Sequence, residues 1–204
     1  MASQGAKVLQ TRSVEMAMKH HVRVQVLSSF EDTPGTLVVD EDEIVEQALV
    51  SGIAYSRDEA KITLLRVPDQ PGVAAKIFGP LTEAAINVDM IVQNVSAETE
   101  RTDLTFTVSR ADLERAVEVL RARQAELGFD ELLSDSNVVK VSVIGVGMRS
   151  HAGVAQQMFT ALAERGINIQ VISTSEIKVS VLIAEEYTEL ALRGLHTAYG
   201  LDAA

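Results

Sequence analysis

The 204-residue sequence contains no cysteine, which rules out a disulfide framework and a thiolate metal site. Basic residues are scarce, because 18 Lys and Arg stand against 29 Asp and Glu, giving a formal net charge of −11. Such a surface argues against nucleic-acid binding, which needs many Lys and Arg beside the phosphates. No apolar run approaches the roughly 20 residues of a membrane-spanning helix, and no signal-peptide core begins the chain. We therefore expect a soluble, cytoplasmic protein that binds neither nucleic acid nor a membrane.

Side chains that carry catalysis or bind metals in other proteins are poorly placed here. His20 and His21 are adjacent on a predicted helix and cannot share one face, while His151 and His196 lack the spacing of a zinc site. Ser150 has no glycine two residues away on either side, so it does not form a nucleophile elbow. No Gly-rich loop with a basic residue is present to hold nucleotide phosphates. We expect no catalytic residue, metal or cofactor in this chain.

The chain contains an internal repeat. Residues 61–96 and 140–175 share an apolar strand, a loop ending in Gly-Val-Ala, an amphipathic helix and an Ile-Asn turn into a second strand. The loop after the first strand is two residues longer in the second copy, at Val146–Gly153 compared with Val67–Gly72. Because loops vary on a shared frame, ligand chemistry is expected in these loops.

Hydrophobic periodicity predicts a β-α-β-β-α-β order in the first copy, which is the ferredoxin-like α+β unit. The second copy repeats this order but ends before a fourth strand. The predicted elements of the first copy are residues 61–67, 71–84, 88–95, 102–108, 111–127 and 131–136, and those of the second are 140–146, 153–165, 169–174, 178–184 and 186–199.

The apolar segment 48–55 (ALVSGIAY) is a candidate for the missing strand. If it completes the second sheet, the first copy is nested within the second; the alternative is a loose hairpin with residues 61–67. The nested interpretation gives one domain at residues 57–137 and another at 48–56 plus 138–204. Before them, residues 1–39 would hold a helix at 6–19, a strand at 22–29 and a Pro34-Gly35 turn, followed by a solvated acidic linker at 40–46.

The first-copy loop, VPDQPG, has the chemistry to bind a free amino acid. Pro71 suits a first helical turn, which would leave the backbone N–H groups of Gly72, Val73 and Ala74 to bind a carboxylate. Asp69 is placed to accept from an ammonium or hydroxyl group. The alternative role for Asp69 is to cap the following helix.

Polar residues also mark the second strand of each copy. Asn87 and Asp89 lie where this strand starts, and strand alternation predicts Asp89, Ile91 and Gln93 on one face. Gln93 offers both a donor and an acceptor. The alternative for Asn87 and its counterpart Asn168 is a turn residue that tolerates left-handed φ.

The motifs together resemble the regulatory region of bacterial aspartate kinases, a pair of ACT domains. The segment 5–38 is similar to the last helix and strand of that family's kinase domain, although the family's phosphate loop is absent. The chain thus resembles the separate regulatory (beta) subunit, or a fragment of a longer kinase. The motifs that carry the resemblance are Gly52-Ile53-Ala54, VPDQPGVAAKIF, INVDMIVQNVS, TDLTFTV, KVSVIGVGMRSHAGVAQQMF and INIQVISTSEIKVSVLI.

The resemblance implies effector binding, typically of lysine and threonine, where the first domain of one chain meets the second domain of another. Ala155 departs from a Thr found in some relatives, and Glu176 would meet a lysine ammonium or form a surface salt bridge. The implied effector-contacting residues are Asp69, Gln70, Pro71, Gly72, Val73, Ala74, Asn87, Val88, Asp89 and Gln93 in the first domain, and Val154, Ala155, Asn168, Ile169, Ser175 and Glu176 in the second.

The resemblance further implies a dimer that regulates a catalytic aspartate kinase alpha subunit, where ATP and Mg would bind. Its role would be feedback inhibition of aspartate-family amino-acid biosynthesis. The alternative function is a free-standing ACT-domain amino-acid sensor that controls another enzyme. The kinase-like segment before residue 39 favours the first function, because an independent sensor has no use for it.

Overall fold

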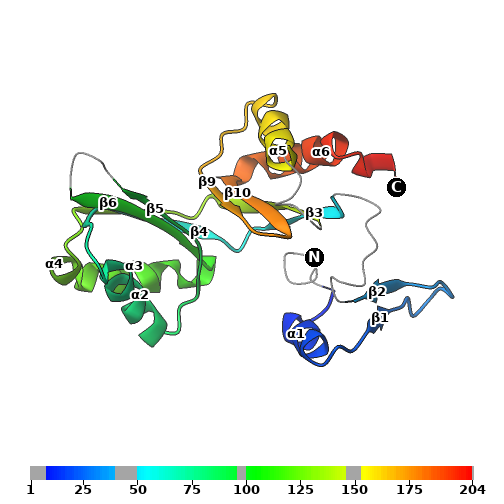
Figure 1. Cartoon of the computed structure of the whole chain (residues 1–204), viewed down its shortest axis with the longest axis horizontal. Coiled ribbons are helices and arrows are strands. Elements are labelled where there is room, and N and C mark those ends of the chain that lie inside the picture. The colour runs from blue at the N-terminus through cyan, green and yellow to red at the C-terminus, as the bar shows by residue number, and fades with distance from the viewer. Residues whose placement is uncertain (1–7, 40–49, 96–99, 146–152, 204) are drawn as a thin grey trace.

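The computed structural model describes residues 8–39, 50–95, 100–145 and 153–203. Figure 1 shows two α/β units whose sheets lie side by side, with helices covering opposite sides of the two sheets. A smaller N-terminal unit lies apart from the helices of both. No described helix is long and apolar enough to cross a membrane.

The first unit is an antiparallel sheet covered on one face by helices, as predicted. The strand order is β5-β6-β4-β7, and side chains such as Ile62, Ile77, Phe106 and Leu120 form its buried core. The predicted helix at 111–127 is instead divided in three, with a break at Arg123, whose backbone leaves the helical region. The elements are β4 (Ala60–Pro68), α2 (Val73–Glu83), β5 (Val88–Val95), β6 (Arg101–Val108), η2 (Arg110–Asp112), α3 (Leu113–Ala122), α4 (Gln124–Leu127) and β7 (Glu131–Asp135).

The second unit confirms the nested arrangement of the two domains. Its strand order is β3-β8-β10-β9, and β3 pairs with β8 from Gly52 opposite Ile144 to Ser56 opposite Lys140. The loose hairpin is wrong, because β4 pairs with β6 and β7 instead. The elements are β3 (Gly52–Ser56), β8 (Val138–Ile144), α5 (Val154–Ala163), β9 (Val171–Thr174), β10 (Lys178–Ala184), η3 (Glu185–Tyr187), α6 (Thr188–Ala198) and η4 (Leu201–Ala203). Residues 48–49 of the predicted strand lie outside the described residues.

Matching hydroxyl pairs lie between the central strands of the two sheets. In the first sheet Thr63 and Thr105 hydroxyls are 3.0 Å apart, and in the second Ser142 and Ser180 hydroxyls are 2.8 Å apart. These four residues occupy equivalent register positions, opposite each other on β4/β6 and β8/β10. The repeat seen in the sequence is therefore also a repeat in side-chain contacts.

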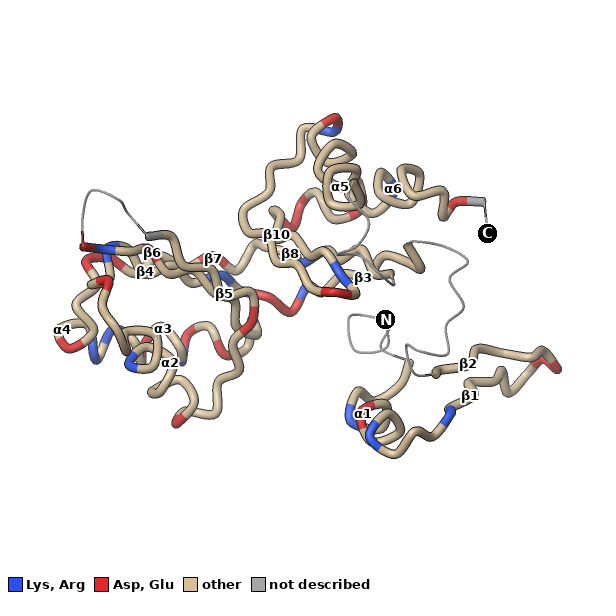
Figure 2. Tube along the Cα trace, viewed as in Figure 1, with Lys and Arg blue, Asp and Glu red and all other residues tan. Residues whose placement is uncertain are grey.

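The two domains meet through β5 and β9, the edge strands of their sheets. A small apolar cluster at this junction contains Met90 and Val92 from the first domain and Val138, Val171 and Leu182 from the second. Figure 2 shows acidic and basic positions close together along the same junction. The domain contact is therefore both apolar and charged.

Two lysines at equivalent places in the repeat reach across this junction in opposite directions. Lys61 on β4 donates to the side-chain oxygen of Gln170 in the second domain. Lys140 on β8 donates to Asp89 on β5 at 2.9 Å. Because Lys61 aligns with Lys140, and Asp89 with Gln170, the junction has approximate two-fold symmetry.

The N-terminal unit contains α1 (Thr11–Lys19) and a hairpin of β1 (Val24–Val26) and β2 (Thr36–Val38). The helix begins later than predicted and the strand is shorter, while β2 was missed because the Pro34-Gly35 segment was interpreted only as a turn. The predicted turn is confirmed at Gly35, where φ is +66° and a Cβ would lie 2.1 Å from the Val26 carbonyl oxygen. Residues 1–7 and the predicted acidic linker 40–46 lie outside the described residues.

Candidate functional site

The loop between β4 and α2 turns into the helix through Gly72, which is the N-cap with φ +89°. The prediction that Pro71 lies in the first helical turn is wrong, because the helix begins at Val73. The Val73 N–H donates to the Gln70 carbonyl at 3.2 Å, so it is not free for a ligand. Ala74 and the residue after it retain the open N–H groups of a helix start. With no acidic side chain in its first turn, this helix end still favours a carboxylate.

Asp69 faces the strand β5 rather than the helix. Its Oδ1 lies 3.5 Å from the Gln93 Nε2, and its backbone N–H donates to the Glu100 carbonyl at 2.9 Å. No side chain caps α2, so the capping role for Asp69 is wrong in this structure. Asp69, Gln93 and the start of α2 thus form one exposed polar group beside the loop.

Asn87, Val88 and Asp89 lie far from that group. Val108 on β6 lies opposite both Val88, the first residue of β5, and the first residue of β4. Val67, near the other end of β4, lies opposite Thr102 on β6. At about 3.3 Å per residue along β6, the two ends are roughly 20 Å apart. Within one chain the predicted first-domain residues therefore form two groups rather than one.

Strand alternation also fails between Asp89 and Gln93. The register of β5 against β6 shifts between Asp89 and Val92, with one extra residue on β5, and Met90 has φ +47°. A bulge of this kind reverses the alternation that follows it. Asp89 and Gln93 therefore lie on opposite faces of the sheet, and the prediction of a shared face is wrong.

The carboxylate of Asp89 binds Lys140, which also forms an ion pair with buried Glu59. Burial alone would raise the pKa of Asp89, but hydrogen bonds from Lys140 and the Met90 N–H outweigh it and hold the pKa below its ordinary value. Burial alone would lower the pKa of Lys140, but hydrogen bonds to Glu59 and Asp89 outweigh it and raise that pKa. Asp89 and Lys140 are therefore both charged near neutral pH, and Asp89 joins the two domains.

In the second domain, Gly153 is equivalent to Gly72, because it is the N-cap of α5 and has φ +113°. The Val154 carbonyl accepts from the Tyr199 hydroxyl at 2.7 Å, and burial raises the pKa of Tyr199 to about 12. Ala155 is half-buried at the start of α5 and packs against the core of this domain. The earlier part of the loop, residues 146–152, lies outside the described residues.

The turn between β9 and β10 brings Ser175 and Glu176 to the same end of the sheet as α5's start. The Ser175 N–H donates to the Lys178 carbonyl at 2.8 Å, and Lys178 is opposite Ile144 at the end of β8. The Ser175 Oγ is buried and has no hydrogen-bond partner among the described residues, which makes it a candidate polar contact for a ligand.

Asn168 and Ile169 lie at the other end of the second sheet, before β9, and Asn168 is exposed. The alternative role for Asn87 and Asn168 was to adopt left-handed φ in a turn. In the structure other residues adopt that conformation. It is adopted two positions earlier, by Ala85 with φ 55° and by Gly166 with φ 68°. Turn geometry therefore does not explain the two asparagines.

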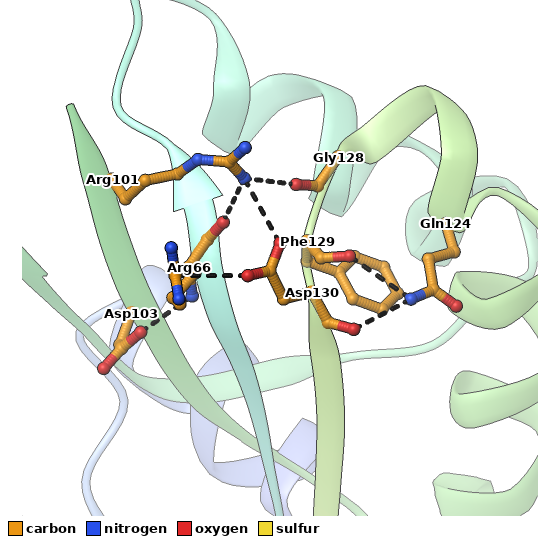
Figure 3. A network of polar contacts seen from close by, with 7 residues as sticks. All are labelled: Arg66, Arg101, Asp103, Gln124, Gly128, Phe129 and Asp130. Carbon is orange, nitrogen blue, oxygen red and sulfur yellow. Dashed lines mark hydrogen bonds and ion pairs between the residues drawn. The ribbon is translucent and has the colours of Figure 1, made fainter. Parts of the chain in front are cut away.

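A polar network that the sequence did not reveal surrounds the bulge before the Asp69 loop (Figure 3). It joins Arg66, Arg101, Asp103 and Asp130 through hydrogen bonds and ion pairs. The available signal was weak: the second copy has Gly145 where the first has Arg66, which suggests an unusual backbone at that position. Among the residues that the structure describes, no group of three or more acidic or histidine side chains is arranged to hold a metal.

Comparison with known proteins identifies the family. ACT-domain models match residues 61–124 and 141–199. The chain is 60% identical over 204 residues to an aspartate kinase of Stutzerimonas stutzeri, covering 100% of this chain and 49% of that protein. The chain thus spans about half the length of the curated relatives it matches.

Two solved structures extend the comparison. The ligand-free regulatory subunit of aspartate kinase from Thermus thermophilus is 44% identical with a TM-score of 0.71, covering 74% of this chain and 99% of that one. E. coli aspartokinase III in complex with lysine and aspartate is 25% identical with a TM-score of 0.72, covering 98% of this chain and 44% of that one. The chain therefore belongs to the aspartokinase family, whose regulatory ACT domains it contains.

Proposed function

We propose that this chain is a non-catalytic regulatory subunit of aspartate kinase, which binds lysine or threonine and thereby inhibits a catalytic partner. The observation that carries the proposal is the match across 99% of a separate regulatory subunit, at 44% identity. The lysine complex of a second relative supports an amino acid as the effector. The residues of the candidate site fit that chemistry.

In the first domain, the start of α2 binds the effector's carboxylate through backbone N–H groups. Asp69 accepts a hydrogen bond from the ammonium or from a threonine hydroxyl, and Gln93 holds Asp69 in place at 3.5 Å. Each of these groups is exposed on one side. An effector bound only there would keep much of its surface in water, so a second wall is needed.

The second domain of another chain supplies that wall. Its Ser175 hydroxyl, which has no partner among the described residues, donates to or accepts from the effector, and Glu176 faces a lysine ammonium. The start of α5 at Val154 and Ala155 completes the contact, whereas Asn87 and Asn168, at the opposite ends of their sheets, do not contact this effector. The protein is accordingly a dimer, and effector binding changes how the two pairs of ACT domains pack.

The catalytic partner is an aspartate kinase alpha subunit, which holds ATP and Mg. The N-terminal unit of α1, β1 and β2 belongs to the kinase fold and carries the effector signal towards it. The complex operates in the cytoplasm, where lysine and threonine accumulate as the products of aspartate-family biosynthesis.

Calorimetric titration with lysine, threonine and methionine tests the proposal directly. We expect lysine or threonine to bind the isolated chain, methionine to bind at least tenfold more weakly, and the same ligand to inhibit aspartate phosphorylation when the catalytic subunit is added. ATP-dependent phosphorylation of aspartate by the purified chain alone would contradict the regulatory assignment, as would failure of both amino acids to bind.

Asp69→Ala tests the proposed contact with the effector. Loss of a charge-assisted hydrogen bond of about 1.5–3 kcal/mol should weaken threonine binding by one to two orders of magnitude. Because Asp69 does not cap α2, the melting temperature of the free protein should stay the same. Asp135→Ala, a half-buried carboxylate at the far end of β7, is the matched control and should bind threonine normally. Lower stability with unchanged affinity would remove Asp69 from the site.

A further inference from the structure

The strand that leads into the Asp69 loop is interrupted by a bulge. The register of β4 against β6 shifts after Leu64, which is opposite Leu104, and resumes at Val67, which is opposite Thr102. Within the bulge, Arg66 has φ +56°, a conformation that residues other than glycine seldom adopt. Such a backbone persists only where surrounding contacts hold it, and it often marks a functional site.

Three contacts hold Arg66, and each uses a different group of the residue (Figure 3). Its backbone N–H donates to Asp103 Oδ1 at 2.8 Å, and its carbonyl accepts from Arg101 Nη1 at 2.6 Å. Its side-chain Nε lies 3.1 Å from Asp130 Oδ2. Because Arg101 and Asp103 are on β6 and Asp130 immediately precedes β7, the bulge is held from both sides of β4.

The same contacts continue to the loop. Arg101 Nη1 also donates to the Gly128 carbonyl at 2.8 Å, and a Cβ built on Gly128 would lie 3.1 Å from Pro68 Cγ. Gly128 therefore packs closely against Pro68, the residue before Asp69. One residue further on, the Asp69 N–H donates to the Glu100 carbonyl. The chain from Arg66 to Asp69 is thus fixed at successive residues.

The second domain lacks this arrangement. The residue aligned with Arg66 is Gly145, and the residue aligned with Asp103 is Lys178, which cannot accept a hydrogen bond from a backbone N–H. β8 pairs with β10 from Val138 to Ile144 without a register shift. Among the described residues the bulge is therefore found in the first domain and not in the second.

We propose that the Arg66 bulge is a positioning element, which sets the Asp69 loop in its ligand-binding conformation before an effector arrives. This inference rests on the proposed function, and it assigns the pre-organised amino-acid site to the first domain. Arg66, Arg101 and Asp103 act through the loop backbone and do not touch the effector. Pre-organisation raises affinity because less conformational freedom is lost on binding.

Two substitutions at Arg66 separate backbone conformation from side-chain charge. Arg66→Gly and Arg66→Val both remove the guanidinium group, but only glycine adopts positive φ without strain. We expect Arg66→Val to weaken threonine or lysine binding about tenfold, because the competent loop becomes a minor conformation, and Arg66→Gly to stay within about threefold of the unmodified chain. Equal losses in the two variants would overturn the proposal.

Asp103 provides a second test with a built-in rescue. Asp103→Ala removes the acceptor for the Arg66 N–H and should weaken effector binding about tenfold, whereas Asp103→Asn keeps an acceptor oxygen and should largely restore it. Arg123→Ala is the control, because it breaks only a surface ion pair with Glu83 in the same domain. A merely structural role for Asp103 would lower the melting temperature while affinity for lysine and threonine stayed unchanged.

Hydrogen exchange on the ligand-free chain makes the test independent of the effector. In Asp103→Ala, the Asp69 amide should exchange at least tenfold faster, while amides of β8 and β10 keep their rates. If the unmodified chain binds neither amino acid, the proposed function fails and the exchange result alone decides whether the bulge positions the loop. An unchanged rate at Asp69 would overturn the positioning role whether or not an effector binds.

Discussion

In the first ACT domain β4 and β5 each contain a bulge, whereas in the second domain β8 and β9 pair with β10 without a register shift. The buried cores and the paired hydroxyls are nevertheless equivalent in the two domains. The bulge on β4 shapes the Asp69 loop, and the bulge on β5 turns Asp89 and Met90 towards the domain junction. The duplicated frame has thus been kept, and the two bulges lie beside the proposed effector loop and at the domain junction.

The junction shows a second difference, in the partners of two aligned lysines. Lys140 lies among the carboxylates of Glu59 and Asp89, while Lys61 meets the neutral amide of Gln170. Glu59 and Lys140 are both buried. The two lysines therefore have symmetric positions but partners of different charge, and substitution of each lysine can measure this difference.

The largest effect is expected from Lys140→Met. It leaves Glu59 buried without a counter-ion, which should lower the free energy of unfolding by about 3–5 kcal/mol. Lys61→Met removes only a hydrogen bond to a neutral amide and should cost about 1 kcal/mol. Urea unfolding at neutral pH measures both changes. Equal losses would mean that the two lysines are equivalent after all.

Leu81→Ala and Leu162→Ala compare the two cores at aligned and fully buried leucines. Each should cost about 2–5 kcal/mol through lost burial and a residual cavity. Because β3 precedes the first domain in sequence but completes the second sheet, we expect the domains to unfold together. Calorimetry should then show one transition, lowered by either substitution. Two transitions, each responding to only one substitution, would contradict this cooperativity.

Stability should also depend on pH through the junction. Because the native pKa of Lys140 is raised, its contribution is complete below the ordinary value of 10.5 and is lost as pH rises through the higher native value. Because the native pKa of Asp89 is lowered, its contribution is complete above 3.8 and is lost as pH falls through the lower native value. Urea midpoints across this range should fall at both extremes. In Lys140→Met the loss above pH 10.5 should be smaller, and an unchanged alkaline loss would exclude Lys140 as its cause.

The smallest effect concerns the turn after the first helix of each copy. Ala85 and Gly166 occupy the same left-handed position, with φ 55° and 68°. Ala85→Gly should stabilise the protein by about 1 kcal/mol, and Gly166→Ala should destabilise it by a similar amount. Urea unfolding of the two single variants measures the difference. Changes of the same sign would show that the two turns are held differently.

Much of the fold could be predicted from the repeat. Apolar periodicity placed β5 and β10 at their observed bounds, and the incomplete second copy pointed to residues 48–55 as its missing strand. The separation of Asn87 from Asp69 was also predictable, because a strand-helix-strand crossover returns to the end of the sheet where it began. That topological consequence was missed, and it divides the first-domain residues into two groups.

The bulges and the charged junction were beyond sequence analysis. Apart from the glycine at the aligned position Gly145, the sequence gives no signal for positive φ at Arg66, since its conformation depends on Arg101, Asp103 and Asp130, which are distant in sequence. The same holds for Lys140, whose two carboxylate partners come from other parts of the chain.

The sequence by itself determined the two ACT domains and the order of their elements, because hydrophobic periodicity and turn residues act over short stretches of chain, while the pairing of β3 with β8 decided the nesting. Only the tertiary structure decided which polar residues meet, which strands bulge and which lysine carries the charged contact between domains. Those outcomes depend on register and on packing between segments far apart in sequence, where a shift of one residue moves a side chain to the opposite face.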